Sequence, residues 1–174
     1  MVTLRALTPD DAPALQRIYS GASVRYTTGR AFTLREAQDK IRAALARAAE
    51  KPRRQWTWGI VVEGELIGRI ALRRRTPAMA SLSYILREDT WGNGYTTEAA
   101  KRVVQFAFTT ADLDFLEAAH HPANLASGCV LAKIGFTRTG TSDRRIGDGT
   151  TVPFPVYALN HPCADPCGTG KDWG

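Results

Sequence analysis

The chain has 174 residues, of which 23 are Lys or Arg and 17 are Asp or Glu, so its formal net charge is +6. Its hydrophobic content of 44% is that of a globular protein and excludes a disordered or collagen-like chain. No apolar run approaches the roughly 20 residues of a membrane-spanning helix, residues 1–5 lack the layout of a secretory signal, and three cysteines are too few for a disulfide scaffold. We therefore expect one cytoplasmic domain over residues 1–160 and a flexible tail at residues 161–174.

Periodicity and capping signals divide the first 50 residues into a strand and two helices. The expected elements are a strand at residues 2–6, a helix at 9–20, a loop at 22–32 and a helix at 33–50. Thr33 and Glu36 form a capping-box signature at the start of the second helix. Its apolar stripe predicts that the buried face carries Leu34, Ala37, Ile41, Ala44, Leu45 and Ala48.

From residue 55 onward the apolar pattern is mostly that of strands. The expected strands cover residues 56–63, 65–75, 80–87, 114–120, 136–141 and 152–159, and the expected helices cover 96–110 and 124–134. Pro153 and Pro155 indicate an edge or bulged position for the last strand, because proline lacks the N–H that a sheet needs. This order predicts an α/β (α+β) fold with a mixed sheet covered on both faces.

A glycine-bearing turn lies between the third predicted strand of this region and the helix that follows it. Gly92 and Gly94 allow a tight turn whose N–H groups point at a bound group. The helix that starts near Thr96 adds unpaired N–H donors and the positive end of its dipole. The arrangement suits a pyrophosphate, although a plain glycine turn has the same pattern. It is neither a P-loop nor a dinucleotide fingerprint, since Thr97 stands where a third glycine would be.

Two separate blocks of the sequence carry a more specific pattern. The block Ser81–Phe108 contains Trp-Gly-x-Gly-Tyr followed by Thr-Glu-Ala. The second block has Asn124 and Ser127, then Val-Leu and Lys-x-Gly-Phe. In this order and on these elements, the blocks resemble the GNAT N-acetyltransferase superfamily, and within it the ribosomal-protein-alanine N-acetyltransferases of RimJ/RimL type. The element order agrees with that family over residues 1–160.

The resemblance implies a GNAT fold: a mixed sheet of six to seven strands, splayed at a cofactor cleft, with about four helices on both faces. It implies acetyl-CoA as co-substrate and no metal. The pantetheine arm would lie along Ser83–Leu86, in a gap beside the strand at residues 114–120. The cofactor-binding residues carried over are Ile85, Leu86, Trp91, Gly92, Asn93, Gly94, Tyr95, Thr96, Thr97, Asn124 and Ser127.

Acetyl transfer to an amine requires a neutral amine and a proton or hydrogen bond for the departing thiolate. Ser127, or a water that it holds, is the candidate for the second role. Glu117 interrupts an apolar strand beside the proposed gap, so it is the leading candidate base, acting through water. The same carboxylate is also suited to binding the amine or pairing with an arginine. Tyr84 has a hydroxyl on the strand at residues 80–87 and is a candidate for catalysis or for packing.

The expected acceptor-binding residues are Arg25, Tyr26, Tyr84, Glu117 and His121. At pH 7 an α-amine is neutral about a tenth of the time, whereas a lysine is neutral about 0.04% of the time. Because no strong base stands out, we expect a protein or peptide N-terminal α-amine as acceptor. An amine-bearing metabolite or antibiotic is the alternative, and a non-catalytic acyl-CoA sensor is the alternative of another class.

Three other interpretations receive less support from the sequence. A zinc site at His161, Cys163 and Cys167 lacks the usual ligand spacing. The Arg runs at residues 51–54, 73–75 and 144–145 are expected to be solvated, and Trp56 and Trp58 to pack in the core, which argues against a nucleic-acid-binding module. A homodimer is also compatible with the sequence.

Overall fold

The computed structural model describes residues 1–162, so Cys163, Cys167 and nearly all of the expected tail lie outside the described residues. The helices are η1 (Pro9–Asp11), α1 (Ala12–Ile18), η2 (Gly21–Val24), α2 (Leu34–Ala48), η3 (Glu88–Thr90), α3 (Tyr95–Thr109) and α4 (Leu125–Lys133), where η denotes a 3-10 helix. The strands are β1 (Thr3–Arg5), β2 (Gln55–Val62), β3 (Glu65–Arg74), β4 (Met79–Leu86), β5 (Phe115–Ala119), β6 (Thr137–Arg145) and β7 (Thr151–Asn160). None of the helices in residues 1–162 has the length and apolarity to span a membrane.

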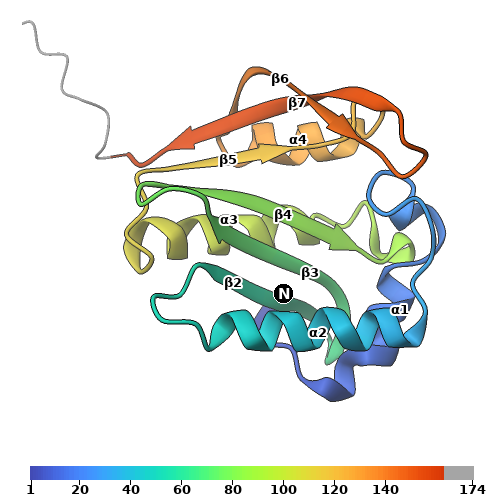
Figure 1. The fold of residues 1–174 in the computed structure, drawn as a ribbon. Helices are drawn as coiled ribbons and strands as arrows, with labels where there is room; N and C mark the ends of the chain where they lie inside the picture. The colour runs from blue at the N-terminus through green and yellow to red at the C-terminus, as the bar shows by residue number, and fades with distance from the viewer. Residues whose placement is uncertain (163–174) are drawn as a thin grey trace, which may run out of the picture.

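The strands form one sheet in the order β1-β2-β3-β4-β5-β7-β6, in which only the β4–β5 pair is parallel. Helices α1 and α2 cover one face of this sheet, and α3 and α4 cover the other (Figure 1). The predicted mixed sheet with helices on both faces is therefore confirmed. The capping box at Thr33 is confirmed too, since the Glu36 N–H donates to Thr33 Oγ1 over 3.2 Å.

The main core lies between the sheet and α3. Trp56 and Trp58 both point to this side and contact Phe106 edge-on, at centroid distances of 5.9 and 5.0 Å. This confirms that the two tryptophans pack in the core. A second cluster joins α1 and α2 to the opposite face, around Leu15, Ile41 and their neighbours.

Helix α2 is less buried than its apolar stripe predicts. Of the six residues expected on its buried face, Ala37 and Ile41 are buried, whereas Leu34 and Leu45 are 42% and 40% exposed. Ala48 is exposed as well. The helix packs through its middle, where Ala37 and Ile41 join the second apolar cluster, and its two ends lie outside that cluster.

The expected loop at residues 22–32 begins with the 3-10 helix η2, which buries Ser23 and Val24. The Ser23 hydroxyl donates to the Leu86 carbonyl over 2.8 Å and so ties this loop to the end of β4. The first helix is also different from the expectation, because its first turn is the separate 3-10 helix η1 and α1 ends at Ile18. The predictions were wrong here because these turns are set by tertiary contacts and not by apolar periodicity.

The hairpin of β6 and β7 is longer than expected, since β6 continues to Arg145 instead of ending near residue 141. Its side chains are almost all exposed, so no apolar pattern marks its second half. Strand β7 lies between β5 and β6, but its pairing with β5 begins only at Val156. Pro153 and Pro155 precede that point, where β7 has β6 as its strand partner. The predicted edge position is thus confirmed for this half of the strand.

The sheet opens between β4 and β5. These strands pair at three positions only, from Met79 with Phe115 to Ser81 with Glu117. Beyond Ser81, β4 stays paired with β3 through Leu86, while β5 turns toward β7. The edge of β4 from residue 82 to residue 86 is therefore without a β5 partner, as the resemblance implied.

Gly68 on β3 is required for the close approach of the open part of β4. A Cβ at this position would lie 2.7 Å from the Ile85 carbonyl oxygen and 2.8 Å from Leu86 Cδ1. We predict that Gly68→Ala lowers the free energy of unfolding by about 1–3 kcal/mol, because backbone and core must shift. Gly140→Ala on β6, where a Cβ meets nothing within 4 Å, is the matched control and should have little effect. Urea unfolding measures both, and equal stabilities would refute the close contact.

Candidate active site

The open edge of β4 borders a cavity of about 470 Å³, which we call the loop cavity. It is formed by the end of β4, the glycine turn, the start of α3, one side of α4 and part of the segment after η2. All eleven residues expected to bind the cofactor line it. The structure thus brings together segments about 40 residues apart in the sequence, and the binding role of each residue stays a prediction.

The glycine turn presents backbone N–H groups to this cavity. Gly92 and Gly94 have φ values of +81° and +76°, a conformation that favours glycine. A Cβ on either residue would meet nothing within 4 Å, so the space beside them is open. Gly94 is the N-cap of α3 and provides no side-chain cap, which leaves the N–H groups of Tyr95, Thr96 and Thr97 without an intrahelical acceptor. Such a helix start is suited to binding an anion.

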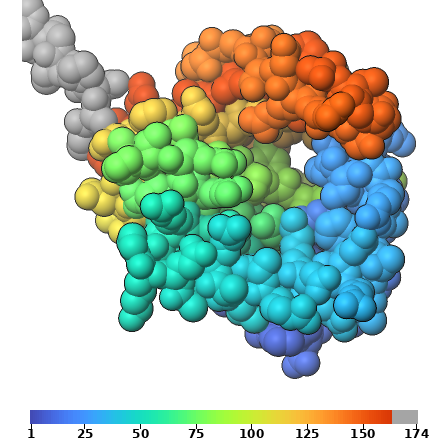
Figure 2. Space-filling view, in the orientation of Figure 1, coloured from blue at the N-terminus to red at the C-terminus, as the bar shows by residue number. Residues whose placement is uncertain are grey.

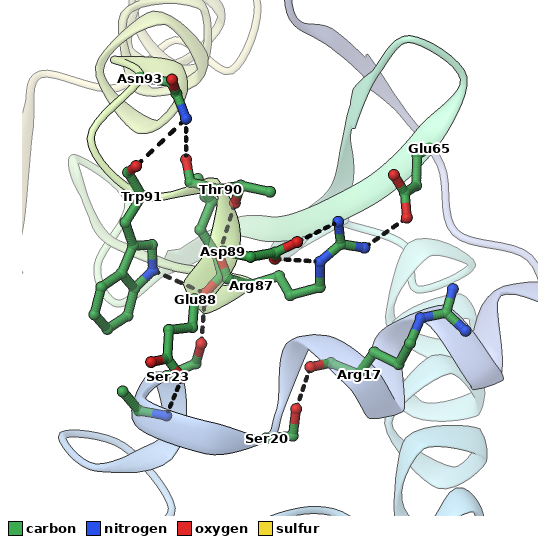
Figure 3. A network of polar contacts seen from close by, with 12 residues as sticks. Arg17, Ser20, Ser23, Glu65, Arg87, Glu88, Asp89, Thr90, Trp91 and Asn93 are labelled. Atoms are coloured by element: carbon green, nitrogen blue, oxygen red, sulfur yellow. Dashed lines mark hydrogen bonds and ion pairs between the residues drawn. The ribbon is translucent and has the colours of Figure 1, made fainter.

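Side chains in and beside the turn hold it in place through hydrogen bonds (Figure 3). The Trp91 indole N–H donates to the Leu86 carbonyl over 3.1 Å. Asn93 Nδ2 donates to the carbonyls of Thr90 and Trp91 over 3.0 and 3.3 Å. The Glu88 carboxylate accepts the Ala22 N–H over 2.7 Å, which links η3 to η2. The turn is therefore fixed from behind, with its backbone donors left for a ligand.

Arg87 and two acidic residues form an ion-pair cluster beside the glycine turn. Arg87 contacts Asp89 and also Glu65, the latter over 2.7 Å (Figure 3). The Arg87 guanidinium holds the pKa values of both carboxyls below their usual range. These carboxylates compensate Arg87, and Lys133 is the cationic side chain that lines the loop cavity within residues 1–162. Lys133 belongs to the second sequence block but is not among the residues predicted to bind the cofactor.

Tyr84 and Ser127 form a hydrogen-bonded pair at the loop cavity. Tyr84 Oη and Ser127 Oγ are 2.8 Å apart, and Ser127 is 9% exposed. Burial raises the pKa of Tyr84 to about 12, so its phenol stays protonated at neutral pH. Asn124 caps α4 by accepting the Ser127 N–H over 3.3 Å, which leaves its Nδ2 free for a ligand. The pair and the cap hold this end of α4 against the open edge of β4.

The expected acceptor-binding residues are divided among several places. Tyr26 lines the loop cavity and its ring contacts His121 at a centroid distance of 5.3 Å. Arg25 is exposed and is not among the residues that line this cavity. Glu117 lines a second cavity of about 510 Å³ on the α2 side of the sheet, which we call the arginine cavity. Glu117 and Ser127 are thus on different sides of the gap between β4 and β5.

Two further residues, His120 and Gly128, make close contacts at this end of the sheet. His120 is buried, and its Nδ1 lies 2.7 Å from the His121 carbonyl oxygen. Gly128 allows His120 and Tyr157 to approach α4, since a Cβ there would lie 3.0 Å from His120 Nε2 and 3.1 Å from Tyr157 Oη. Four polar or thiol side chains outside the eleven expected cofactor-binding residues also line the loop cavity: Ser23, Thr27, Thr90 and Cys129.

The comparison with known proteins gives a consistent result. A family model described as an acetyltransferase (GNAT) domain matches residues 1–137. The chain is 28% identical over 166 residues to YoaA of Bacillus subtilis (strain 168), an uncharacterized N-acetyltransferase, with 91% of this chain and 93% of that protein covered. The crystal structure of Mycobacterium smegmatis RimJ in complex with CoA-disulfide has a TM-score of 0.79 at 22% identity, covering 95% of this chain and 84% of that one.

A second solved structure is of RimL, a ribosomal L7/L12 alpha-N-protein acetyltransferase in complex with coenzyme A. It has a TM-score of 0.80 at 17% identity and covers 94% of this chain and 96% of that one. At these identities the two likenesses show a shared fold.

Replacing Gly94 tests whether the turn binds a pyrophosphate. Alanine is strained at the left-handed φ by about 1–2 kcal/mol, so Gly94→Ala should rotate the N–H groups away from the cavity. We predict that it weakens coenzyme A binding about tenfold, which corresponds to about 1.4 kcal/mol. Gly64→Ala, in the β2–β3 turn with a φ of +79° and the same free space, controls for strain alone. Equal affinities of the two variants in calorimetric titration would contradict the role of the turn.

The raised pKa of Tyr84 predicts a loss of stability at alkaline pH. An unfolded tyrosine ionises near pH 10, whereas Tyr84 in the fold keeps its proton up to about pH 12. Between these values the unfolded chain binds fewer protons than the folded one, so the free energy of unfolding falls as pH rises, by about 1 kcal/mol at pH 11. Tyr84→Phe should lack this part of the decrease. Urea unfolding at pH 9 and pH 11 compares the unchanged protein with Tyr84→Phe. Identical decreases in the free energy of unfolding would show that burial does not raise the pKa of Tyr84.

Proposed function

The chain belongs to the GNAT acetyltransferase family, and on that premise we propose that it transfers the acetyl group of acetyl-CoA to the N-terminal α-amine of a protein or peptide. GNAT enzymes use acetyl-CoA, and the chain is an N-acetyltransferase of this family. The observation that carries the proposal is the alignment of the glycine turn, the open edge of β4 and the Tyr84–Ser127 pair along one cavity.

The described residues fit the cofactor along this cavity. The N–H groups of residues 94–97, with Lys133 nearby, are suited to the pyrophosphate. The unpaired edge of β4 supplies backbone hydrogen-bonding groups to the pantetheine arm, and Asn124 Nδ2 supplies a further donor. Bound acetyl-CoA supplies the thioester from which the acetyl group is moved. The chain's own part is to hold that thioester at the gap and to handle two protons.

The acetyl group moves by direct attack of the amine on the thioester of acetyl-CoA. The amine nitrogen forms a bond to the acetyl carbon while the carbon–sulfur bond breaks, the amine loses one proton, and the sulfur gains one. Tyr84 Oη lies 2.8 Å from Ser127 Oγ and also donates to the Ser127 carbonyl over 3.3 Å, so the Tyr84 hydrogen is used on Ser127 and the Ser127 hydroxyl hydrogen remains to be donated. We assign that remaining hydrogen to the leaving sulfur. The pKa of Tyr84 of about 12 keeps the pair fully protonated at neutral pH.

Glu117 is assigned to the amine, on the opposite side of the gap. It lies at the last position where β5 pairs with β4, and within residues 1–162 its carboxylate has no ion-pair partner. A free carboxylate at this place is suited to receiving the proton of the attacking amine, through a water. An α-amine demands less of such a base than a lysine does, because its pKa is lower by about 2.5. The names of structural neighbours, among them a ribosomal-protein-S5-alanine acetyltransferase, also favour an N-terminal acceptor.

The decisive experiment is a thiol-release screen with acetyl-CoA and peptides of varied first residue, compared with polyamines, free amino acids and aminoglycosides. We expect peptides with a free N-terminus to be turned over and the same peptides with a blocked N-terminus to be inert. Turnover of aminoglycosides or polyamines alone would replace the proposed acceptor with a small molecule. No turnover of any amine would refute catalysis of this reaction.

Ser127→Ala tests the assignment of the proton donor. We predict a decrease in kcat of about a hundredfold, because a general acid contributes at least this much, while the affinity for coenzyme A stays within a few-fold. Thr137→Ala, at an exposed position on β6, is the control and should keep both values. If Ser127→Ala kept its kcat, Ser127 would have no part in the reaction.

A further inference from the structure

The arginine cavity carries an uncompensated positive charge that the reaction alone does not require. It lies between α2, the sheet and the β6–β7 hairpin, where Figure 2 shows the molecule hollowed between the cyan helix and the orange hairpin. Its charged lining consists of Lys40, Arg69, Arg73, Arg75, Arg144 and Glu117. One carboxylate thus faces five cationic side chains.

The sheet explains why these cations gather. Arg69, Arg73 and Arg75 are separated by even numbers of residues along β3 and its end, so they point to the same face. Ser81 lies beside Arg73 on β4, and its hydroxyl accepts from Arg75 over 3.1 Å. Arg144 arrives from β6. Lys40 joins these residues from α2.

These cations have no acidic partners in the described part of the chain. The ion pairs formed within residues 1–162 involve other residues, so none of the five is within 4.0 Å of a carboxylate oxygen. Arg69 Nε is buried and has no hydrogen-bond partner. Burial and the neighbouring Arg69 lower the pKa of Lys40 to about 8. A buried, unpaired donor and a destabilised ammonium group indicate a site whose occupant is an anion.

The cavity also reaches the gap where acetyl transfer would occur. Ser81 and Glu117, the last paired residues of β4 and β5, both line it, and so does Ser83, at the start of the open edge. A molecule bound there would have its reacting end at Glu117 and its remaining groups among the arginines. Since the loop cavity lies against α4 and the start of α3, the two ligands would approach the gap from different sides.

We propose, on the basis of the function proposed above, that the acceptor carries carboxylate groups close to its reacting amine, bound by Arg69, Arg73 and Arg144 while the amine lies at Glu117. Guanidinium groups are well suited to this role, because their forked donors match a carboxylate. The same chemistry is present in a peptide whose residues after the first are acidic and in a free acidic amino acid.

The test uses the full chain and peptides that begin with alanine followed by acidic, neutral or basic residues, with free glutamate and aspartate as a separate arm. We expect kcat/KM to favour acidic over neutral peptides at least about tenfold, with a preference that shrinks as salt rises. Turnover of the free amino acids instead of the peptides would assign the carboxylates to a small molecule and support the same site. Equal rates for acidic, neutral and basic acceptors would overturn the proposal.

The variants Arg73→Gln and Arg144→Gln test whether the preference for acidic peptides arises in the arginine cavity. Both side chains are exposed, so the variants should fold. We expect each to raise KM for the acidic peptide about tenfold, with kcat, coenzyme A affinity and neutral-peptide kinetics unchanged. Arg47→Gln, on the exposed end of α2, removes the same charge outside the cavity and should have no effect. A preference for acidic peptides that persists in both cavity variants would overturn the assignment.

A binding measurement separates this inference from the function on which it rests. Acidic and neutral peptides are titrated into the protein saturated with coenzyme A. Equal affinities overturn the anionic acceptor whatever the turnover. Tighter binding of the acidic peptide that is lost in Arg73→Gln supports it, even if no amine is acetylated, in which case only the proposed reaction fails.

Discussion

The separation of β4 from β5 after three residue pairs is the feature on which the site depends. A parallel pair that continued would satisfy the backbone groups of both strands and close the sheet. Because β5 turns toward β7, the edge of β4 stays open, and a cavity forms on each side of the gap. Contacts from outside the two strands keep the end of β4 in place, among them the Ser23 and Trp91 bonds to the Leu86 carbonyl.

The two cavities differ in the way in which they present positive charge. In the loop cavity, partial charges on backbone N–H groups face the ligand, while Arg87 is compensated by two carboxylates behind the turn. In the arginine cavity the charges are whole side chains that have no acidic partner within residues 1–162. The arrangement in the loop cavity costs little folding free energy, because the N–H groups of the first helical turn have no intrahelical acceptor in any helix. The second arrangement keeps like charges together, and burial with the neighbouring Arg69 lowers the pKa of Lys40, so the cavity favours an anionic occupant.

Most of the fold and the eleven expected cofactor-binding residues in the lining of the loop cavity could be predicted from the sequence, because strand alternation, caps and the two blocks are local signals. The arginine cavity could not. Arg73–Arg75 is a run of like charges that suggests a solvated surface, and only the sheet shows that two of its members point into the same hollow. The burial of α2 was overestimated as well, since an apolar stripe does not show how much of the helix packs against the apolar cluster. Glu117 was noticed as a carboxylate within an apolar strand, but the side of the gap that it faces depends on register.

The most direct test of the account is a crystal structure of the protein with coenzyme A. We predict that the diphosphate oxygens lie within hydrogen-bonding distance of the N–H groups of residues 94–97 and that the pantetheine arm runs beside residues 82–86 of β4. The arginine cavity should remain free of the coenzyme. A coenzyme bound elsewhere, with the gap closed by β5 pairing along β4, would contradict the account.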